Sequence, residues 1–106
     1  MAAMPDRGDV WLVDLGLAAK VRPCLVVSIR NESNDRTLVT LVPHTTSARG
    51  SRFEVVVPKN FLKSGAFDVQ GIVTVAEARL IRKLGRLERG EIEGVEQRLK
   101  LWLGLS

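Results

Sequence analysis

The chain of 106 residues is 45% hydrophobic and 26% charged, a composition that predicts one globular domain over residues 1–106. It holds one cysteine, Cys24, and one histidine, His44, which excludes an internal disulfide, a cysteine-cluster zinc site and a histidine triad. The net charge is +4, from sixteen Lys and Arg against twelve Asp and Glu. This excess favours a polyanionic partner, and the alternative is a solvated basic surface. No apolar run approaches the roughly 18 to 20 residues that span a bilayer, so we expect a soluble, cytoplasmic protein with no membrane partner and no cofactor.

Short apolar runs separated by turn-forming residues predict four strands in the first sixty residues. The expected strands cover residues 9–14, 24–29, 37–43 and 52–57. The second run is almost entirely apolar, which predicts a strand buried on both faces. The fourth run places Phe53, Val55 and Val57 on one face.

The second half of the chain predicts a bend followed by a helix. Residues 60–65 are compatible with a single helical turn, and residues 67–75 contain two extended pieces around Gly71, which indicates a bulge or a sharp bend in a curved sheet. An apolar stripe then predicts a C-terminal helix of about 14 residues that ends at Gly104. The stripe consists of Ile92, Val95, Leu99, Trp102 and Leu103. The expected fold class is therefore mainly β with a C-terminal helix, a small, strongly curved and mostly antiparallel half-barrel.

Arg22 and Pro23 stand directly before the most apolar expected strand. Proline fixes the backbone that enters the strand and holds the arginine at the strand's mouth. A guanidinium is always protonated and presents five donors in a rigid fork, which suits a phosphate that gains charge during a reaction. The other interpretation is an ordinary surface arginine, so the hypothesis needs a second motif.

That second motif is Pro43-His44-Thr45-Thr46-Ser47, which concentrates three hydroxyls and an imidazole after the next expected strand. If the second and third expected strands pair antiparallel, Arg22 and Pro43 lie at the same end of the sheet and both motifs face one cleft. Side chains alternate along an extended backbone, so we expect Thr45 and His44 to point to opposite sides and only one of them to line the cleft. The alternative is a Ser/Thr turn that caps its own backbone.

The remaining charged and aromatic residues narrow the chemistry. Basic residues are densest over residues 82–89, which suits neutralisation of phosphates. Trp11 and Trp102 lie in apolar patterns and are expected in the core rather than in a base-stacking platform. Asp68 and Glu77 are isolated acids without the spacing of a carboxylate pair, so neither glycosidase chemistry nor a metal site is expected.

Four motifs follow one another along the chain from Arg7 to Leu105. They are Arg7-Gly8-Asp9-Val10-Trp11, Arg22-Pro23 leading into Leu25-Val26-Val27, Pro43-His44-Thr45, and Leu101-Trp102-Leu103-Gly104-Leu105. In this order and spacing they resemble the MazF/PemK family, toxin ribonucleases of type II toxin-antitoxin systems. The resemblance implies an SH3-like half-barrel of the MazF/PemK/CcdB type that forms a homodimer and cleaves single-stranded RNA at short sequences without a metal. It also implies a cognate antitoxin as the partner that restrains the chain.

The resemblance implies roles for individual residues. The family's arginine before proline maps to Arg22, and its threonine in the pattern proline, any residue, threonine maps to Thr45, so these two are the expected catalytic residues. Where many members carry Cys-Asp-Gln, this chain has Asp68-Val69-Gln70, so only the glutamine matches and the aspartate base proposed in some relatives does not carry over. The residues expected to bind the substrate are Lys20, Thr46, Ser47, Arg49 and Gln70.

Metal-free cleavage of RNA uses the adjacent 2'-hydroxyl as the nucleophile and leaves a 2',3'-cyclic phosphate and a 5'-hydroxyl. Arg22 suits stabilisation of the phosphate charge, and Thr45 suits a hydrogen bond to a phosphate oxygen or to the nucleophile. The general base stays unassigned, because His44 has the right pKa range but is expected on the wrong face. Two other functions stay open: a CcdB-like poison that binds DNA gyrase through its C-terminus, suggested by Trp102 and Gly104, and a half-barrel that binds nucleic acid without cleaving it.

Overall fold

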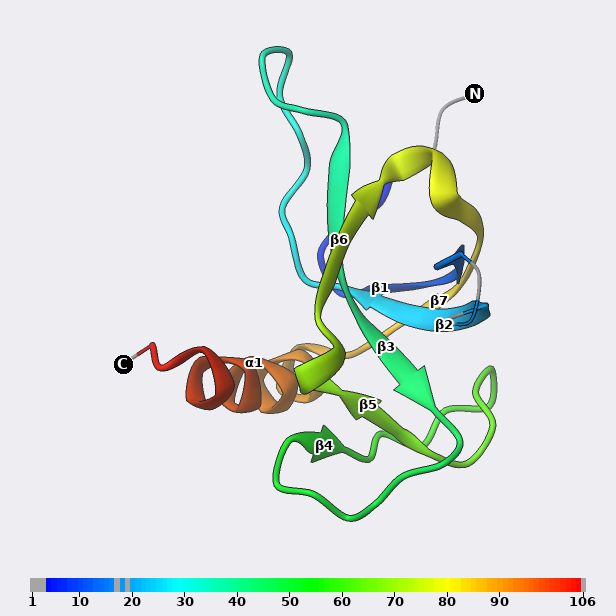
Figure 1. Cartoon of the computed structure of the whole chain (residues 1–106), viewed down its shortest axis with the longest axis vertical. Coiled ribbons are helices and arrows are strands. Elements are labelled where there is room, and N and C mark those ends of the chain that lie inside the picture. Colours follow the sequence, from blue (N-terminus) through cyan, green and yellow to red (C-terminus); the bar gives the residue numbers. More distant parts are fainter. Residues whose placement is uncertain (1–3, 17, 19, 106) are drawn as a thin grey trace.

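Strand β3 (Leu38–Thr45) is the central strand of the fold, because it pairs with three other strands. The computed structural model describes residues 4–16, 18 and 20–105 (Figure 1). In this part of the chain a seven-stranded antiparallel sheet is followed by one α-helix, α1 (Arg89–Leu103). The remaining strands are β1 (Asp9–Asp14), β2 (Val21–Val26), β4 (Glu54–Val55), β5 (Ala66–Asp68), β6 (Val73–Ala76) and β7 (Leu80–Arg86). The expected fold class, mainly β with a C-terminal helix, is confirmed.

The sheet has the strand order β4-β5-β3-β2-β1-β7, with β6 also paired to β3. Against β2, Pro43 of β3 stands opposite Cys24, so the predicted antiparallel pairing of these two strands is confirmed. β6 pairs with the first half of β3, and β5 pairs with its last two residues. Between β5 and β6 the 3-10 turn η2 (Val69–Gly71) interrupts the pairing, which is the bend expected around Gly71.

Strand β2 begins earlier than the sequence predicts. It covers Val21–Val26 instead of residues 24–29, so Arg22 lies inside the strand rather than before it. The reason is the neighbouring strand β1, in which Val13 stands opposite Arg22. Pairing with β3 starts only at Cys24, so β3 does not flank the stretch of β2 that carries Arg22.

Strands β3 and β4 also differ in length from their predictions. β3 runs two residues beyond the expected end, to Thr45, because its last residues pair with β5. β4 shrinks to Glu54–Val55, although the expected alternation holds, with Phe53 and Val57 both buried. Residues 60–65 contain a hydrogen-bonded turn but no helix.

Strand β7 is a strand that the sequence analysis does not predict. It pairs antiparallel with β1, with two register shifts that disturb the regular alternation. Arg82, Lys83 and Arg86 further interrupt its apolar pattern. β7 lies at the end of the sheet, where charged side chains protect an open edge from pairing with other chains. The same charged residues explain why the sequence pattern does not predict this strand.

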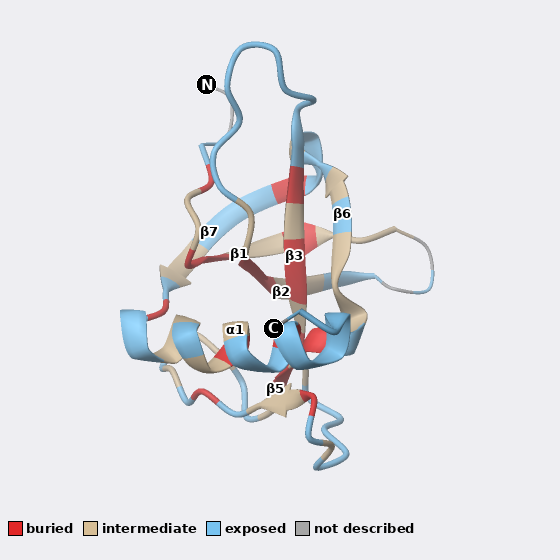
Figure 2. Ribbon diagram, turned by 90° about the vertical axis from the view of Figure 1, so that its left-hand side faces the viewer, coloured by how far each residue is buried: buried red, intermediate tan, exposed pale blue. Residues whose placement is uncertain are grey.

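The core lies on both faces of β2 and β3, which confirms that the apolar second strand is buried on both sides as far as Val26. Ile29, expected in that strand, lies in the following loop and is 79% exposed. Val95 and Leu99 of α1 cover one of two clusters (Figure 2). This cluster includes Val10, Leu25, Val42, Phe67 and Val69, and the other cluster includes Val13, Cys24, Val26, Val39 and Leu41.

Helix α1 has 15 residues and ends as predicted at Gly104, whose φ of +69° is the left-handed conformation that glycine adopts most readily. Its last turn extends past the sheet (Figure 1). Trp102, expected in the core, is therefore 43% exposed and packs edge-on against Phe53 with ring centroids 5.3 Å apart. Trp11 is partly buried against the second cluster. No helix in the described residues is both long and apolar enough to cross a membrane.

The N-terminal motif around Asp9 contains a buried carboxylate. Asp9 is 1% exposed, and its Oδ1 lies 2.9 Å from Nη1 of Arg86 and 3.3 Å from Nζ of Lys83, both on β7. Its Oδ2 accepts the backbone N–H of Asp6 at 2.9 Å. The carboxylate therefore joins the start of β1 to the edge strand through cations that are themselves about half exposed.

We predict that Asp9→Ala lowers the free energy of unfolding by about 2 to 3 kcal/mol, because it removes a charged acceptor from several donors at once. Asp35→Ala is the matched control, since that carboxylate also accepts a backbone N–H but is exposed, and it should change stability by less than about 0.5 kcal/mol. Urea unfolding followed by circular dichroism measures both. Equal effects of the two substitutions would contradict the assignment.

Candidate active site

A cleft of about 600 Å³ opens beside the ends of β2 and β3. Its walls come from β2, the end of β3, the β3–β4 connection, β4, and the β5–η2–β6 segment. We call it the Arg22 cleft and define it by its lining residues: Leu15, Arg22, Pro43, His44, Thr45, Ser47, Arg49, Ser51, Glu54, Asp68, Gln70, Gly71 and Val73. The structure thus brings the two motifs of the sequence analysis to one cleft.

Arg22 enters the cleft from the stretch of β2 that β3 does not flank. Its neighbour Cys24 is fully buried, and burial raises the pKa of the thiol to about 12, while the positive charge of Arg22 acts in the opposite direction. A thiol with this pKa holds its proton at neutral pH, so Cys24 is not a nucleophile there. Arg22 is therefore the residue of β2 that can act on a ligand in the cleft.

Thr45 stands at the end of β3 with its hydroxyl already oriented. Oγ1 accepts the backbone N–H of Ser47 at 3.0 Å, a local turn of the kind considered in the sequence analysis. A hydroxyl has one hydrogen to donate and two lone pairs. With one lone pair engaged by Ser47, the hydroxyl hydrogen can still be donated to an oxygen in the cleft.

His44 also borders the cleft, so the expectation that only one of His44 and Thr45 lines it is wrong. The alternation itself holds, since His44 is buried and Thr45 is partly exposed, but β3 ends at the cleft wall, where both residues pair with β5 and both border the cleft. His44 is 4% exposed and meets the ring of Phe67 edge-on at 5.0 Å. Burial lowers the pKa of the imidazole below its usual 6.5, so His44 is neutral at neutral pH.

Two carboxylates face the cleft, which corrects the description of Asp68 as isolated. Glu54 and Asp68 are Cα partners across β4 and β5, and both line the cleft. Asp68 Oδ1 accepts the backbone N–H of Gln70 at 3.1 Å and so begins η2. No group of three or more His, Cys, Asp or Glu side chains within the described residues is placed to hold a metal ion.

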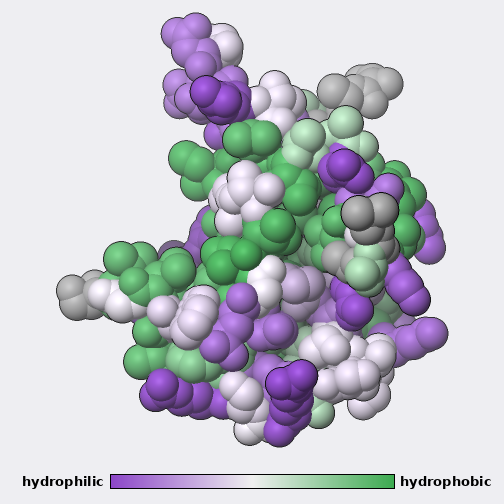
Figure 3. All heavy atoms as spheres, in the orientation of Figure 1, coloured by the Kyte–Doolittle hydropathy of each residue, from purple (hydrophilic) through white to green (hydrophobic). Residues whose placement is uncertain are grey.

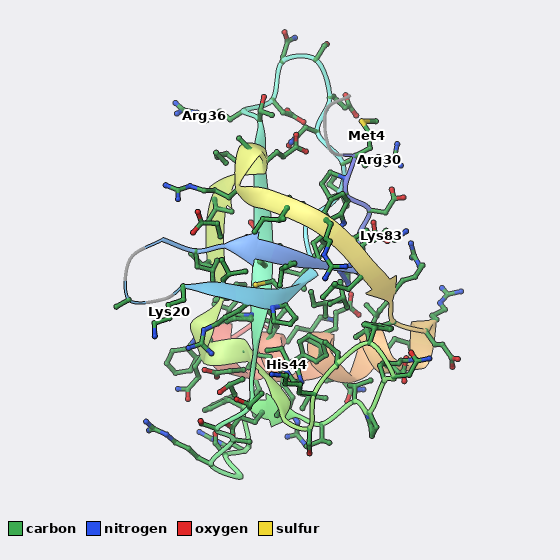
Figure 4. The ribbon with its side chains drawn as sticks, turned by 90° about the vertical axis from the view of Figure 1, so that its right-hand side faces the viewer. Met4, Lys20, Arg30, Arg36, His44 and Lys83 are labelled. Atoms are coloured by element: carbon green, nitrogen blue, oxygen red, sulfur yellow. The ribbon has the colours of Figure 1, made fainter. Side chains whose placement is uncertain are left out.

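The residues expected to bind substrate fall into two groups. Ser47, Arg49 and Gln70 line the Arg22 cleft. Lys20 and Thr46 are exposed outside its lining. Figure 4 shows Lys20 where the β1–β2 connection enters β2, well away from His44. That connection lies partly outside the described residues.

Several cleft residues were missed because no local pattern marks them. Glu54 and Ser51 reach the cleft only through long-range pairing of β4. Gly71 carried a usable signal, since its glycine already predicts the bend. A Cβ at this position would lie 2.9 Å from Cγ of Pro43, so the close approach of η2 to β3 requires glycine.

The sequence profile of the family described as "PemK-like, MazF-like toxin of type II toxin-antitoxin system" matches residues 6–103. The chain belongs to this family. Among curated members, the probable endoribonuclease MazF5 of Mycobacterium tuberculosis is 34% identical over 91 residues, 82% of each chain. Endoribonuclease MazF9 of the same organism is 32% identical and covers 96% of this chain and 98% of its own length. The predicted family and enzyme class, a MazF endoribonuclease of a toxin-antitoxin system, are confirmed.

Solved MazF structures share the fold over almost the whole chain. A MazE-MazF crystal structure from Deinococcus radiodurans has a TM-score of 0.82 at 25% identity and covers 98% of this chain and 99% of that chain. A mycobacterial endoribonuclease in complex with its cognate antitoxin has a TM-score of 0.77 at 25% identity, covering 96% and 95% of the two chains. The half-barrel expected for the MazF family is therefore the fold of this chain.

We predict that His44, the chain's single histidine, titrates below its usual pKa of 6.5 in an NMR titration, because burial of the imidazole disfavours its charged form. Just below pH 6.5, His44 is therefore protonated in the unfolded chain but stays neutral in the folded chain. The free energy of unfolding should therefore be constant just above about pH 6.5 and fall as the pH drops toward 5.

His44→Gln, which cannot titrate, should lose this pH dependence between pH 5 and 6.5. A titration midpoint at or above 6.5 in the folded chain would show that the imidazole is solvated or paired with a charge.

Proposed function

We propose that this chain is the toxin of a type II toxin-antitoxin system, a cytoplasmic single-domain protein over residues 1–106 that cleaves single-stranded RNA at short specific sequences without a metal. The observation that carries the proposal is the meeting of Arg22 and Thr45 in one cleft. Membership of the MazF family and the endoribonuclease names of the curated relatives support the choice of RNA over other polyanions.

The proposed reaction needs no external nucleophile. The 2'-oxygen forms a bond to the adjacent phosphorus and loses its proton to a base, while the bond from phosphorus to the 5'-oxygen breaks and that oxygen gains a proton. The products are a 2',3'-cyclic phosphate and a 5'-hydroxyl. The protein has to orient the nucleophile, stabilise the added charge on the phosphate and handle two protons.

Arg22 is the proposed charge-stabilising residue. A planar guanidinium is a cation that can give two parallel hydrogen bonds to phosphate oxygens. The adjoining strand end supplies Thr45, whose free hydroxyl hydrogen is proposed to bind a phosphate oxygen or to hold the nucleophile. Together they place fixed donors around the position where charge develops.

Two cleft groups can accept the proton of the 2'-hydroxyl. His44 is neutral at neutral pH because burial lowers its pKa, and the side chain of Asp68 also lines the cleft. Glu54, the other carboxylate of the cleft, accepts hydrogen bonds from backbone N–H groups that lower its pKa. Proton acceptance is therefore proposed for His44 or Asp68 and not for Glu54.

Substrate binding is proposed to extend from the cleft along the exposed surface. Ser47, Arg49 and Gln70 would contact the nucleotides next to the cleaved bond, since they line the cleft. Lys20 and Thr46 lie outside the lining and would contact phosphates farther along the strand. Phosphate contacts of this kind fix position, whereas contacts to base edges select sequence.

We predict that the purified chain cuts a long single-stranded RNA in the presence of excess EDTA and leaves discrete fragments with cyclic phosphate ends. Intact but retarded RNA would support a non-catalytic binding protein instead. Intact RNA without any retardation would support a poison of a protein target such as DNA gyrase. Activity that EDTA abolishes and Mg²⁺ restores would contradict the metal-free mechanism.

We predict that Arg22→Ala lowers the single-turnover cleavage rate by about 100-fold or more, the scale of losing one preorganised charge-stabilising donor. Arg22→Lys should recover little, because an ammonium cannot reproduce the planar fork. Thr45→Ala should cost less than Arg22→Ala, and Thr45→Ser should keep most activity because the hydroxyl remains.

Circular dichroism of each variant serves as the folding control. A near-normal rate for folded Arg22→Ala would place the active site elsewhere. His44→Ala is not a neutral control, since it removes a buried ring that packs against Phe67.

We further propose that the chain forms a homodimer and binds a cognate antitoxin. Apolar side chains that are 43% to 60% exposed gather at the end of α1 (Figure 3): Leu101, Trp102, Leu103 and Leu105. A short chain buries a limited core, so covering this surface with a second copy adds stability. The solved MazE-MazF complexes of relatives support an antitoxin as the second partner.

We predict a particle of twice the 11.7 kDa chain mass in light scattering at micromolar concentration. Leu101→Glu combined with Leu105→Glu should shift it toward the monomer, because two charges would be buried at the interface. An acidic antitoxin segment should displace RNA, since both would compete for Arg22 and Arg49 in the cleft. A wild-type monomer, or a ternary complex with full RNA affinity, would contradict these proposals.

A further inference from the structure

Glu54 presents an electrostatic problem in a cleft proposed to bind phosphates. Its carboxylate lines the same cleft as Arg22 and Arg49, and a free negative charge there would repel RNA. In the structure, this carboxylate accepts hydrogen bonds from the backbone. Oε1 and Oε2 accept the N–H of Arg49 at 2.9 and 3.1 Å, and Oε1 also accepts the N–H of Ser51 at 2.9 Å.

These hydrogen bonds close a tight turn in the β3–β4 connection. Gly50, between the two donors, has a φ of +74° in the left-handed region, which directs neighbouring N–H groups toward one anion. Two further bonds return to Ser51: the N–H of Glu54 donates to its carbonyl at 3.1 Å, and the N–H of Phe53 donates to its Oγ at 3.0 Å. The N–H groups of Arg49 and Ser51 hold the pKa of Glu54 below its usual 4.5, so the carboxylate is charged at neutral pH.

The other end of Glu54 is anchored in the sheet. Its Cα pairs with Asp68 of β5, and the next pair joins Val55 to the fully buried Phe67. The carbonyl of Phe53 accepts the N–H of Val69 at 3.0 Å. Glu54 therefore links the exposed β3–β4 connection to the sheet.

We propose that Glu54 is a positioning residue that holds the turn at residues 49–51 so that Arg49 presents its cation to an RNA phosphate. The proposal rests on the proposed ribonuclease function. It assigns Glu54 neither a contact with RNA nor a proton transfer. Its effect passes entirely through Arg49, so removing Glu54 should matter only while Arg49 is present.

The experiment measures KM, kcat and their salt dependence with an RNA that the wild-type chain cleaves. The variants are Glu54→Ala, Glu54→Gln, Arg49→Ala and the double variant Glu54→Ala/Arg49→Ala. Asp35→Ala is the matched control, because Asp35 also holds a turn through a backbone N–H, that of Glu32 at 2.8 Å, but lies outside the cleft. Circular dichroism and thermal melting report on folding.

We expect Glu54→Ala to raise KM about tenfold with kcat within about twofold, and to reduce the slope of log KM against log salt by about 0.7, the value for one lost phosphate contact on a single strand. Arg49→Ala should do the same, and the double variant should be no worse than Arg49→Ala. Glu54→Gln keeps one acceptor oxygen and should recover part of the binding. Asp35→Ala should match the wild type in both constants.

Other outcomes overturn the proposal in different ways. A loss of kcat at constant KM in Glu54→Gln would make Glu54 a proton-transfer group. A lower KM in Glu54→Ala would make its charge a simple repulsion of RNA. Additive effects in the double variant, or an unchanged KM in both Glu54 variants, would show that Glu54 does not act through Arg49. If the wild-type chain cleaves no RNA, the proposed function itself fails.

Discussion

Strand β3 is the constraint on which the rest of the structure depends, because one strand serves three partners. Its residues 41–43 pair with β2, residues 38–41 with β6, and residues 44–45 with β5. β2 therefore extends past the point where β3 turns to β5, and Arg22 on this unflanked end lines the same cleft as Thr45. The cleft is a product of register, so a slip of one residue between β2 and β3 would turn one of the two side chains away.

The charges around this register have separate tasks. Asp9 lies at the first residue of β1, whereas Arg22 stands opposite Val13 near the other end of that strand. The ion pairs of Asp9 join the edge strand β7 to the sheet. In the cleft, Glu54 accepts hydrogen bonds from backbone N–H groups. Cys24 lies in the core beneath β2, where burial keeps its thiol protonated. A phosphate that enters the cleft would meet Arg22 and Arg49 beside a Glu54 carboxylate and a Thr45 hydroxyl whose hydrogen bonds are already formed, which is the preorganisation that the proposed charge stabilisation needs.

Local sequence patterns were enough to predict that residues on strands adjacent in the sequence meet in the cleft. Arg22 and Thr45 could be placed together because each flanks a strongly apolar strand and consecutive strands commonly pair antiparallel. Glu54 could not be placed, because its partner Asp68 follows a long connection and no local signal reports that register. Alternation predicted that His44 and Thr45 differ in burial, but not that both residues border the cleft where the strand ends. Sequence periodicity describes regular strands, whereas this site is built where strands stop.

The central claim is that the phosphate to be cleaved lies between Arg22 and Thr45. The most direct test is a crystal structure of the chain with an RNA that carries a 2'-deoxy substitution at its mapped cleavage position, which removes the nucleophile and leaves the phosphate intact. The account predicts that this phosphate lies within about 3 Å of the Arg22 guanidinium and of Thr45 Oγ1, the range of direct hydrogen bonds. The same phosphate bound away from both side chains, for example over β7, would contradict the account.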